Sequence, residues 1–339
     1  MDTRRFRSAM VGLVVLAPAT LAPAGSATAQ QTYTLRYAVD TERNINGLAQ
    51  TVAERQGFFT REGINFQPVR FVATGNRPTD RTALVASRDT FDMARMQLSV
   101  LMEPEGRFKG TNYVAVSSVA NNPAYFLVAR PDIKTFADLK GKTLTEPSPN
   151  DPITLTARKL MELHGLKDGD VEIKTIAGSQ PRVDCLKSGA CAAGSLSQPS
   201  AFAAFDAGFH TLAMHFEAGP LLYVVDIVDR SWAEAHSEVI VRYIRATAAA
   251  MRFIHDPRNL DEVVKAAVEI THQPESRARE MLSYFQDAKN DVLPKQGEID
   301  TTAVKATIAL FGQYGILKGP LPPPERFVDL RYAQMAGVQ

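Results

Sequence analysis

Short apolar stretches alternate with amphipathic stretches along most of the chain, and this pattern predicts strands followed by helices. Before residue 122 it predicts strands at 35–39, 66–72, 91–96 and 114–119 and helices at 47–56 and 78–87. Five further strands are predicted at 125–129, 142–145, 171–176, 191–195 and 211–216, with helices at 153–164, 180–187 and 200–207 and one helical turn at 136–139. Such alternation is typical of parallel sheets covered by helices.

After residue 220 the pattern changes from mixed to helical. One strand is predicted at 221–227, followed by helices at 237–254, 260–271, 274–285 and 301–314 and by a proline-rich stretch at 319–324. Helices without new strands need an existing sheet to cover. We therefore expect an α/β protein of two lobes, each a mostly parallel sheet flanked by helices. Lobe 1 would comprise residues 30–122 and 219–339, lobe 2 residues 123–218, and the two crossings between them would form a hinge.

The first 29 residues have the pattern of an export signal. Three arginines precede an apolar run at residues 9–21, and a small-x-small cleavage site follows at 27–29. The apolar run is shorter than the ~20 residues that a bilayer span requires. We expect cleavage after Ala29 and a soluble mature protein in the periplasm.

Composition and charge narrow the choice of partners. The chain has 339 residues, of which 45% are hydrophobic and 22% charged, with a net charge of +1. The signal contains three Arg and one Asp, so its removal changes the charge by −2 and leaves −1. A nearly neutral mature chain argues against nucleic acid and anionic membranes as partners.

The chain has only two cysteines, Cys185 and Cys191. In an oxidising compartment they could form a disulfide between a helix end and the following strand. The alternative is two buried free thiols. Without histidines at ligand spacing they do not indicate zinc, and we expect no metal, no other cofactor and no catalytic residue.

Four segments carry a resemblance to a known family: residues 53–64, 132–144, 183–193 and the helical tail from Val239. They resemble the periplasmic substrate-binding proteins of ABC transporters of the nitrate/sulfonate/taurine type, which share a fold with the NMT1/THI5-like family. The resemblance extends over about 33–317, with one departure, because Ala192 occupies the place of the family's acidic residue. It implies a monomer that captures a small polar or anionic organic ligand between two lobes and delivers it to an ABC permease.

Two other functions are compatible with the same fold. An exported sensor would present its ligand to a membrane receptor instead of a permease. Pyrimidine synthases of the THI5 type are enzymes, but they carry a cysteine-rich metal motif and a reactive histidine near the first loop. This chain has two cysteines in total and no histidine in residues 44–47, so we expect a protein that is not an enzyme.

In two-lobed folds ligands bind where strands end and helices begin. Candidate ligand-binding residues at these positions in lobe 1 are Asp40, Glu42, Arg43, Asn44, Asn46, Gly75, Asn76, Arg77, Gln97 and Asn121. Those in lobe 2 are Ser148, Asn150, Ser179, Gln180, Ser197 and Gln198. Arg77 is the expected partner of an anionic ligand, because a guanidinium can bind two oxygens at once. The charge of the ligand stays open.

Overall fold

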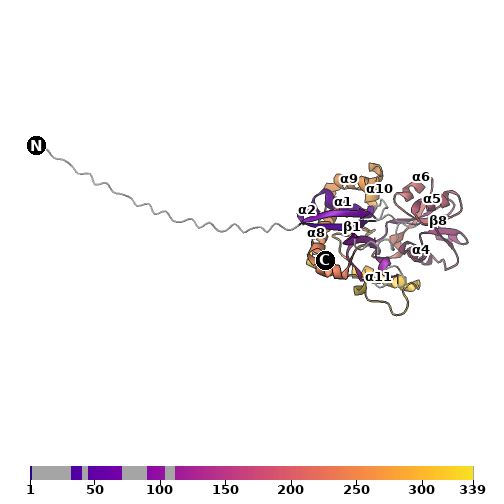
Figure 1. Ribbon diagram of the computed structural model, residues 1–339. Helices are drawn as coiled ribbons and strands as arrows, with labels where there is room; N and C mark the ends of the chain where they lie inside the picture. The colour runs from indigo at the N-terminus through magenta and orange to yellow at the C-terminus, as the bar shows by residue number, and fades with distance from the viewer. Residues whose placement is uncertain (2–31, 40–44, 71–89, 104–110, 339) are drawn as a thin grey trace. The chain divides into compact units, whose positions relative to one another are not determined.

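The computed structural model describes residue 1 and residues 32–39, 45–70, 90–103 and 111–338 (Figure 1). The predicted export signal and the predicted helix at 78–87 lie outside these residues, as does the end of the strand predicted at 66–72. Residues 32–339 form one compact unit. Within the described part of the chain, none of the helices has the length and apolarity needed to cross a membrane.

The first sheet has five strands in the order β2-β1-β3-β10-β4. Its strands are β1 (Tyr33–Val39), β2 (Ile64–Arg70), β3 (Met93–Gln97), β4 (Tyr113–Ala120) and β10 (Val224–Asp229). β1 pairs in parallel with β2 and β3, whereas β10 is antiparallel to both β3 and β4. Strand β10, which lies between β3 and β4, is therefore supplied by a segment about a hundred residues downstream of β4.

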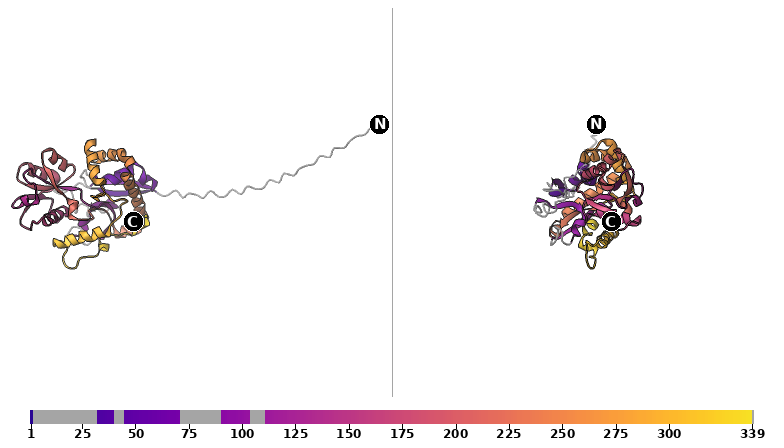
Figure 2. Two further views of the ribbon diagram at one scale, coloured as in Figure 1. Left: turned by 180° about the vertical axis from the view of Figure 1, so that it is seen from behind. Right: turned by 90° about the vertical axis from the view of Figure 1, so that its right-hand side faces the viewer.

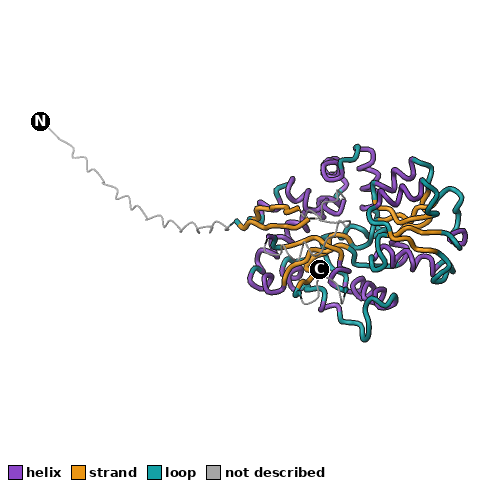
Figure 3. The backbone as a smooth tube through the Cα atoms, turned by 45° about the vertical axis from the view of Figure 1, so that its right-hand side comes forward, coloured by secondary structure: helices purple, strands orange, loops and turns teal. Residues whose placement is uncertain are grey.

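The second sheet has the order β7-β6-β8-β5-β9 and uses an uninterrupted part of the chain. Its strands are β5 (Tyr125–Ala129), β6 (Thr143–Glu146), β7 (Glu172–Thr175), β8 (Ala193–Ser197) and β9 (His210–Met214). β6 is parallel to β7 and β8, but β5 is antiparallel to β8 and β9. The two groups of strands are separate in Figure 3.

Helices surround both sheets, as the views in Figures 1 and 2 show. The α-helices are α1 (Leu48–Arg55), α2 (Phe58–Arg61), α4 (Pro152–Leu163), α5 (Ser179–Lys187), α6 (Ser200–Asp206), α7 (Arg230–Ala235), α8 (Ser237–His255), α9 (Leu260–Thr271), α10 (Glu275–Gln286), α11 (Thr301–Gln313) and α12 (Arg331–Met335). The 3-10 helices are η1 (Ile45–Gly47), η3 (Leu98–Leu101), η4 (Phe136–Leu139), η5 (His215–Ala218), η6 (Pro257–Asn259) and η7 (Pro324–Arg326).

Long helix α8 shows why the C-terminal part of the chain is helical. Ile240, Tyr243 and Ile244 are buried at spacings of three and four residues, followed by Ala248 and Met251 on the same stripe. This stripe packs against α1 and α2, which precede it by nearly two hundred residues. The C-terminal helices thus complete the core of the first sheet, as the sequence predicted.

One carboxyl group lies inside that core. Asp226, on β10, accepts hydrogen bonds from the hydroxyls of Tyr37, Ser117 and Tyr243. Gln50 donates to both tyrosine hydroxyls, at 3.2 and 2.9 Å. Burial raises the pKa of Asp226 to about 6, although its hydrogen bonds and Arg95 act in the opposite direction. The folded protein therefore binds a proton at this carboxyl more tightly than the unfolded chain does.

The chain passes between the sheets twice, and the two passages are hydrogen-bonded to each other. The backbone N–H of Tyr223 donates to the carbonyl of Asn121 at 2.8 Å. The side chain of Asn122 accepts from the N–H of Leu221 at 3.0 Å. The N–H of Asn121 also donates to the carbonyl of Val292 at 2.8 Å. Three segments distant in sequence thus form one junction.

The expectation of mostly parallel sheets is confirmed, with one reversed strand in each sheet. In the first sheet β1, β2, β3 and β4 run in one direction, and in the second β6, β7, β8 and β9 do. The two reversed strands are β10 and β5. Each of these two strands directly follows a passage of the chain from one sheet to the other. It therefore enters its sheet at the end where the chain crosses, where the other strands leave it.

Of the two alternatives for Cys185 and Cys191, the structure has the disulfide, which lies at the end of α5 with Cα atoms 5.3 Å apart.

Candidate functional site

The ends of the two sheets meet at a pair of tyrosines. Tyr125 begins β5 and pairs with Ser197 at the end of β8. Tyr223 precedes Val224, which pairs with Gln97 at the end of β3. The two tyrosine rings have centroids 6.4 Å apart at an edge-to-face angle. The end of the first sheet at which β3 finishes therefore lies against the end of the second sheet at which β8 finishes, as a site between two lobes requires.

Polar and aromatic groups from both sheets continue from this pair. The Gln97 amide donates to the Tyr223 hydroxyl at 3.2 Å, and the Ser99 hydroxyl donates to the Gln97 amide oxygen at 3.4 Å. On the other side, Tyr125 lies edge-on to His215, with centroids 6.2 Å apart. Burial is the largest cause of the raised pKa of Tyr223, so its hydroxyl stays neutral and can both donate and accept.

Helix α5 begins beside this end of the second sheet with two serines and a buried cation. The hydroxyls of Ser179 and Ser197 are 2.8 Å apart, and the Ser197 N–H donates to Ser179 at 3.1 Å. Arg182 is 2% exposed and donates to Ser179 Oγ at 3.0 Å and to the carbonyls of Ser195 and Ile176 at 2.6 and 2.9 Å. None of these three acceptors is a carboxylate. The cation adds to the positive end of the helix dipole, and this arrangement favours an anion.

Helix α4 begins beside the same end, and Ile153 from its first turn packs with Val119, Tyr223 and Val224 of the first sheet. Asp151 caps this helix by accepting from the Ile153 N–H at 2.9 Å, with Pro152 in the first helical position. The capping aspartate makes this helix start a less favourable anion seat than the start of α5.

Some buried polar atoms at this end of the second sheet have no hydrogen-bond partner. Among the described side chains, both amide atoms of Gln198 and one oxygen of Glu146 are in this state, as are the hydroxyls of Thr145 and Thr154. Burying such groups without partners costs free energy. They are therefore available to a ligand or to water at the strand ends.

The predicted ligand-binding residues fall into three groups. Gln97, Ser179, Ser197 and Gln198 lie at the strand ends just described. Four others are exposed or serve the local fold. Asn150 is exposed, and the exposed Gln180 donates to Asp184 at 3.2 Å. The Ser148 carbonyl closes a turn with the Asp151 N–H at 3.1 Å. Asn121 is buried and donates to Asp291 at 3.1 Å.

Asn46 lies within η1, and its side chain is half-buried. The remaining candidates lie outside the described residues: Asp40, Glu42, Arg43, Asn44, Gly75, Asn76 and Arg77. The assignment of ligand contacts stays a prediction for all of these residues.

Five residues at the site were not selected from the sequence: Tyr125, Glu146, Arg182, His215 and Tyr223. Tyr125 and Tyr223 lie in predicted strands and Arg182 in a predicted helix, and the sequence pattern does not distinguish them from their neighbours. Glu146 carried the clearest signal, since a carboxylate directly after a buried strand needs a partner or a proton.

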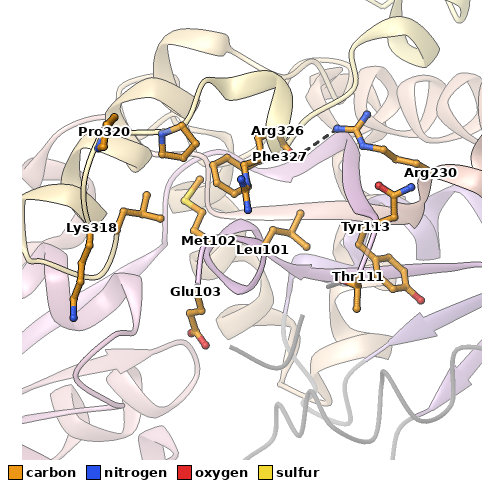
Figure 4. Close-up of a pocket in the computed structure, with 13 residues that line it drawn as sticks. Leu101, Met102, Glu103, Thr111, Tyr113, Arg230, Lys318, Pro320, Arg326 and Phe327 are labelled. Carbon is orange, nitrogen blue, oxygen red and sulfur yellow. Dashed lines mark hydrogen bonds between the residues drawn. The ribbon is translucent and has the colours of Figure 1, made fainter. Parts of the chain in front are cut away.

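A separate cavity of about 520 Å³ lies at the other end of the strands of the first sheet, where β4 begins and β10 ends (Figure 4). Tyr113, at the start of β4, and Arg230, directly after β10, line it together with residues of the proline-rich stretch. Arg230 donates to the carbonyls of Glu325 and Arg326 at 2.7 and 3.5 Å. Because Gln97 lies at the other end of the sheet, this cavity is not part of the candidate site. Within the described ranges, no three His, Cys, Asp or Glu residues gather as metal ligands would.

Comparisons with known proteins agree with this geometry. A family model described as NMT1/THI5 like matches residues 44–259. No curated protein matches the sequence. The ligand-binding component of an ABC-type import system from Staphylococcus aureus has a TM-score of 0.72 and 14% identity, covering 91% of this chain and 99% of that one.

Two further solved structures illustrate the functions that this fold supports. The periplasmic aliphatic sulphonate-binding protein SsuA from Escherichia coli has a TM-score of 0.68 and 13% identity, covering 91% of this chain and 99% of its own. The desulfurization enzyme DSZB has a TM-score of 0.65 and 14% identity, covering 89% and 98%. At these identities the likeness establishes the fold, which is the α/β fold of two-lobed periplasmic binding proteins.

Proposed function

The chain belongs to the NMT1/THI5-like family, and from this premise we propose that it is an extracytoplasmic solute-binding protein. It captures a small polar or anionic organic ligand, such as a sulfonate or carboxylate, and delivers it to an ABC permease. The observation that carries this proposal is the meeting of the strand ends of both sheets at Tyr125 and Tyr223, beside the start of α5.

The proposal includes the arrangement of the chain. Residues 30–122 and 219–339 form lobe 1, residues 123–218 form lobe 2, and the junction at Asn121, Asn122 and Tyr223 is the hinge. Residues 1–29 direct export to the periplasm and are cleaved after Ala29, and the mature protein acts as a monomer. The structural likeness to binding components of importers supports this arrangement.

An enzymatic function has less support, although the fold also occurs in DSZB. The two cysteines of this chain are joined to each other, so neither is a free thiol that could act as a nucleophile. The contacts at the strand ends suit the holding of a ligand, since hydroxyls, amides and a buried cation converge there.

The test is a ligand screen by thermal shift. A ligand that binds only the folded state raises the melting temperature, so sulfonates, carboxylates, nitrate and pyrimidines are added separately to the mature protein. We expect one class to stabilise it, with one molecule bound per chain by calorimetry. No stabilisation by any class would contradict the proposal.

A matched pair of serines on α5 locates the site. Ser179→Ala removes the hydroxyl at the first residue of the helix and should weaken binding of an anion about tenfold, as expected for one lost hydrogen bond to a charged group. Ser188 caps the other end of the same helix, and Ser188→Ala should leave the affinity unchanged. Equal effects of the two substitutions would place the ligand elsewhere.

A further inference from the structure

The second sheet covers a row of four hydrogen-bonded side chains, which we call the buried relay: Glu146, Ser195, His215 and Thr156. Ser195 Oγ lies 2.6 Å from Glu146 Oε1 and 2.8 Å from His215 Nε2. His215 Nδ1 lies 2.7 Å from Thr156 Oγ1, which is 2.9 Å from each of two carbonyl oxygens in the first turn of α4. Each of the four residues is at most 1% exposed.

Counting hydrogens fixes the charge of the relay. Carbonyl oxygens only accept, so the Thr156 hydroxyl donates to the helix and His215 Nδ1–H donates to Thr156. The bond between His215 Nε2 and Ser195 and the bond between Ser195 and Glu146 then need two more hydrogens. Ser195 supplies one, and the other is a proton on either Glu146 or Nε2. All bonds of the relay are made only while this extra proton is present, and the relay is then neutral overall.

The environment favours the form with the proton on Glu146. Burial raises the pKa of Glu146 to about 8, although the bond from Ser195 and the charge of Arg182 lower it. Burial, and then Arg182, lower the pKa of His215 to about 3. Both shifts disfavour charge within the relay at neutral pH.

The charged and titratable groups around Glu146 come from several elements. Arg182 of α5 and Asp151 at the start of α4 act on it electrostatically, and His215 of η5 reaches it through Ser195. On β7 the residue opposite is Thr175, which does not titrate. From β5, Tyr125 faces His215. Arg182 is the cation that acts on both Glu146 and His215, and its own hydrogen bonds go to two carbonyls and to Ser179.

We propose that Glu146 determines the charge of the ligand that this protein prefers, by carrying the extra proton of the relay and so leaving the charge of Arg182 uncompensated beneath the start of α5. With the proton present, the start of α5 is electropositive and favours an anion. Loss of the proton places a negative charge beside Arg182 and cancels this preference. The inference rests on the proposed binding function.

The experiment measures affinity against pH with ethanesulfonate and nitrate, which stay anionic at every pH used. For the mature protein, affinity should fall roughly tenfold between pH 6.5 and 9.5, as one added charge at this depth would cause. Glu146→Gln cannot lose a proton and keeps a donor toward Ser195, so its affinity should be independent of pH. Glu172→Gln, on the exposed side of β7, should follow the unmodified protein.

A second measurement requires no ligand. Carbon-13 spectra of the unliganded protein with labelled Glu carboxyls should contain one resonance titrating near pH 8, which Glu146→Gln removes. A Glu146 midpoint near 4.5 would overturn the relay, as would the same pH profile of affinity in Glu146→Gln and in the unmodified protein. If neither anion binds at pH 6.5 while the resonance titrates near pH 8, the proton is on Glu146, but the proposed control of ligand charge is wrong.

Discussion

At the scale of single residues, the protein places two carboxyl groups where water does not reach them. Asp226 lies in the first sheet beneath α8, and Glu146 lies at the end of β6 in the second. In both cases burial is the largest cause of a raised pKa. Hydrogen bonds with hydroxyls hold both groups in place, which is how a core accommodates a carboxyl group.

Asp226 makes the stability of the first sheet depend on pH. Its pKa is raised in the folded protein, so its favourable contribution is present at low pH and is lost as the pH rises from about 4 through 6. The unfolding free energy of Asp226→Asn minus that of the unmodified protein should therefore increase by roughly 2–3 kcal/mol as the pH rises from 4 to 7. Urea unfolding at four pH values measures this difference.

The control for this measurement is Asp184→Asn, because Asp184 is exposed on α5. Its unfolding free energy should keep a constant difference from that of the unmodified protein. If Asp226→Asn also showed a constant difference, Asp226 would have an ordinary pKa in the folded state.

At the scale of elements, strands β6 and β8 approach each other closely where Gly194 faces Thr145. A Cβ atom on Gly194 would lie 2.5 Å from the Thr145 Cγ2 methyl and 3.2 Å from its carbonyl oxygen. These strands carry Glu146 and Ser195, so their spacing also positions the buried relay. Glycine is therefore required here for strand packing.

Gly194→Ala should lower the unfolding free energy by about 1–3 kcal/mol, the usual cost of overpacking a core. Thr145→Ser removes the obstructing methyl and should restore part of the loss when it is combined with Gly194→Ala. Chemical denaturation of both single variants and the double variant gives the coupling. Strictly additive effects would show that the methyl is not the obstacle.

The disulfide joins the end of α5 to the segment that leads into β8. It closes a short loop, with a sequence separation of 6, so its removal should cost about 2 kcal/mol. The variant with both cysteines replaced by serine should unfold at lower denaturant concentration than the unmodified protein. Dithiothreitol should shift the unmodified protein by the same amount and leave the variant unchanged, and a shift of both would indicate another cause.

Element type and position followed from the sequence more readily than strand direction did. The predicted strand at 125–129 and helix at 260–271 coincide with β5 and α9, because each is a strongly patterned segment bounded by turn residues. Alternation of apolar residues is the same for both strand directions, so it could not reveal that β5 and β10 are antiparallel. The site residues Glu146 and His215 are 69 positions apart, and only the folded sheet brings them together.

At the scale of the whole molecule, helices beside the first sheet contact helices beside the second in two places. Arg277 of α10 binds Asp206 of α6 at 2.5 and 2.7 Å. Glu162 of α4 accepts from the Tyr314 hydroxyl, after α11, at 2.8 Å. Polar contacts between partly exposed groups are weak, contributing ~0–1 kcal/mol each. They would therefore permit the lobes to separate and close.

Hinge closure should be visible by small-angle scattering. A stabilising ligand from the thermal-shift screen should reduce the radius of gyration of the mature protein, because ligand contacts to both lobes favour the closed form. The Ser179→Ala variant, at a ligand concentration that saturates only the unmodified protein, should keep the larger radius. An unchanged radius in the saturated protein would contradict closure.

The position of β10 has a consequence for the order of folding. A chain that emerges N-terminus first, from a ribosome or an exporter, presents all five strands of the second sheet by residue 214. The first sheet begins earlier but lacks β10 until residue 229 has emerged, so until then no strand joins β4 to β3. We therefore expect the second sheet to fold first, although the chain begins with strands of the first sheet. Those strands must wait for β10 before their sheet is complete.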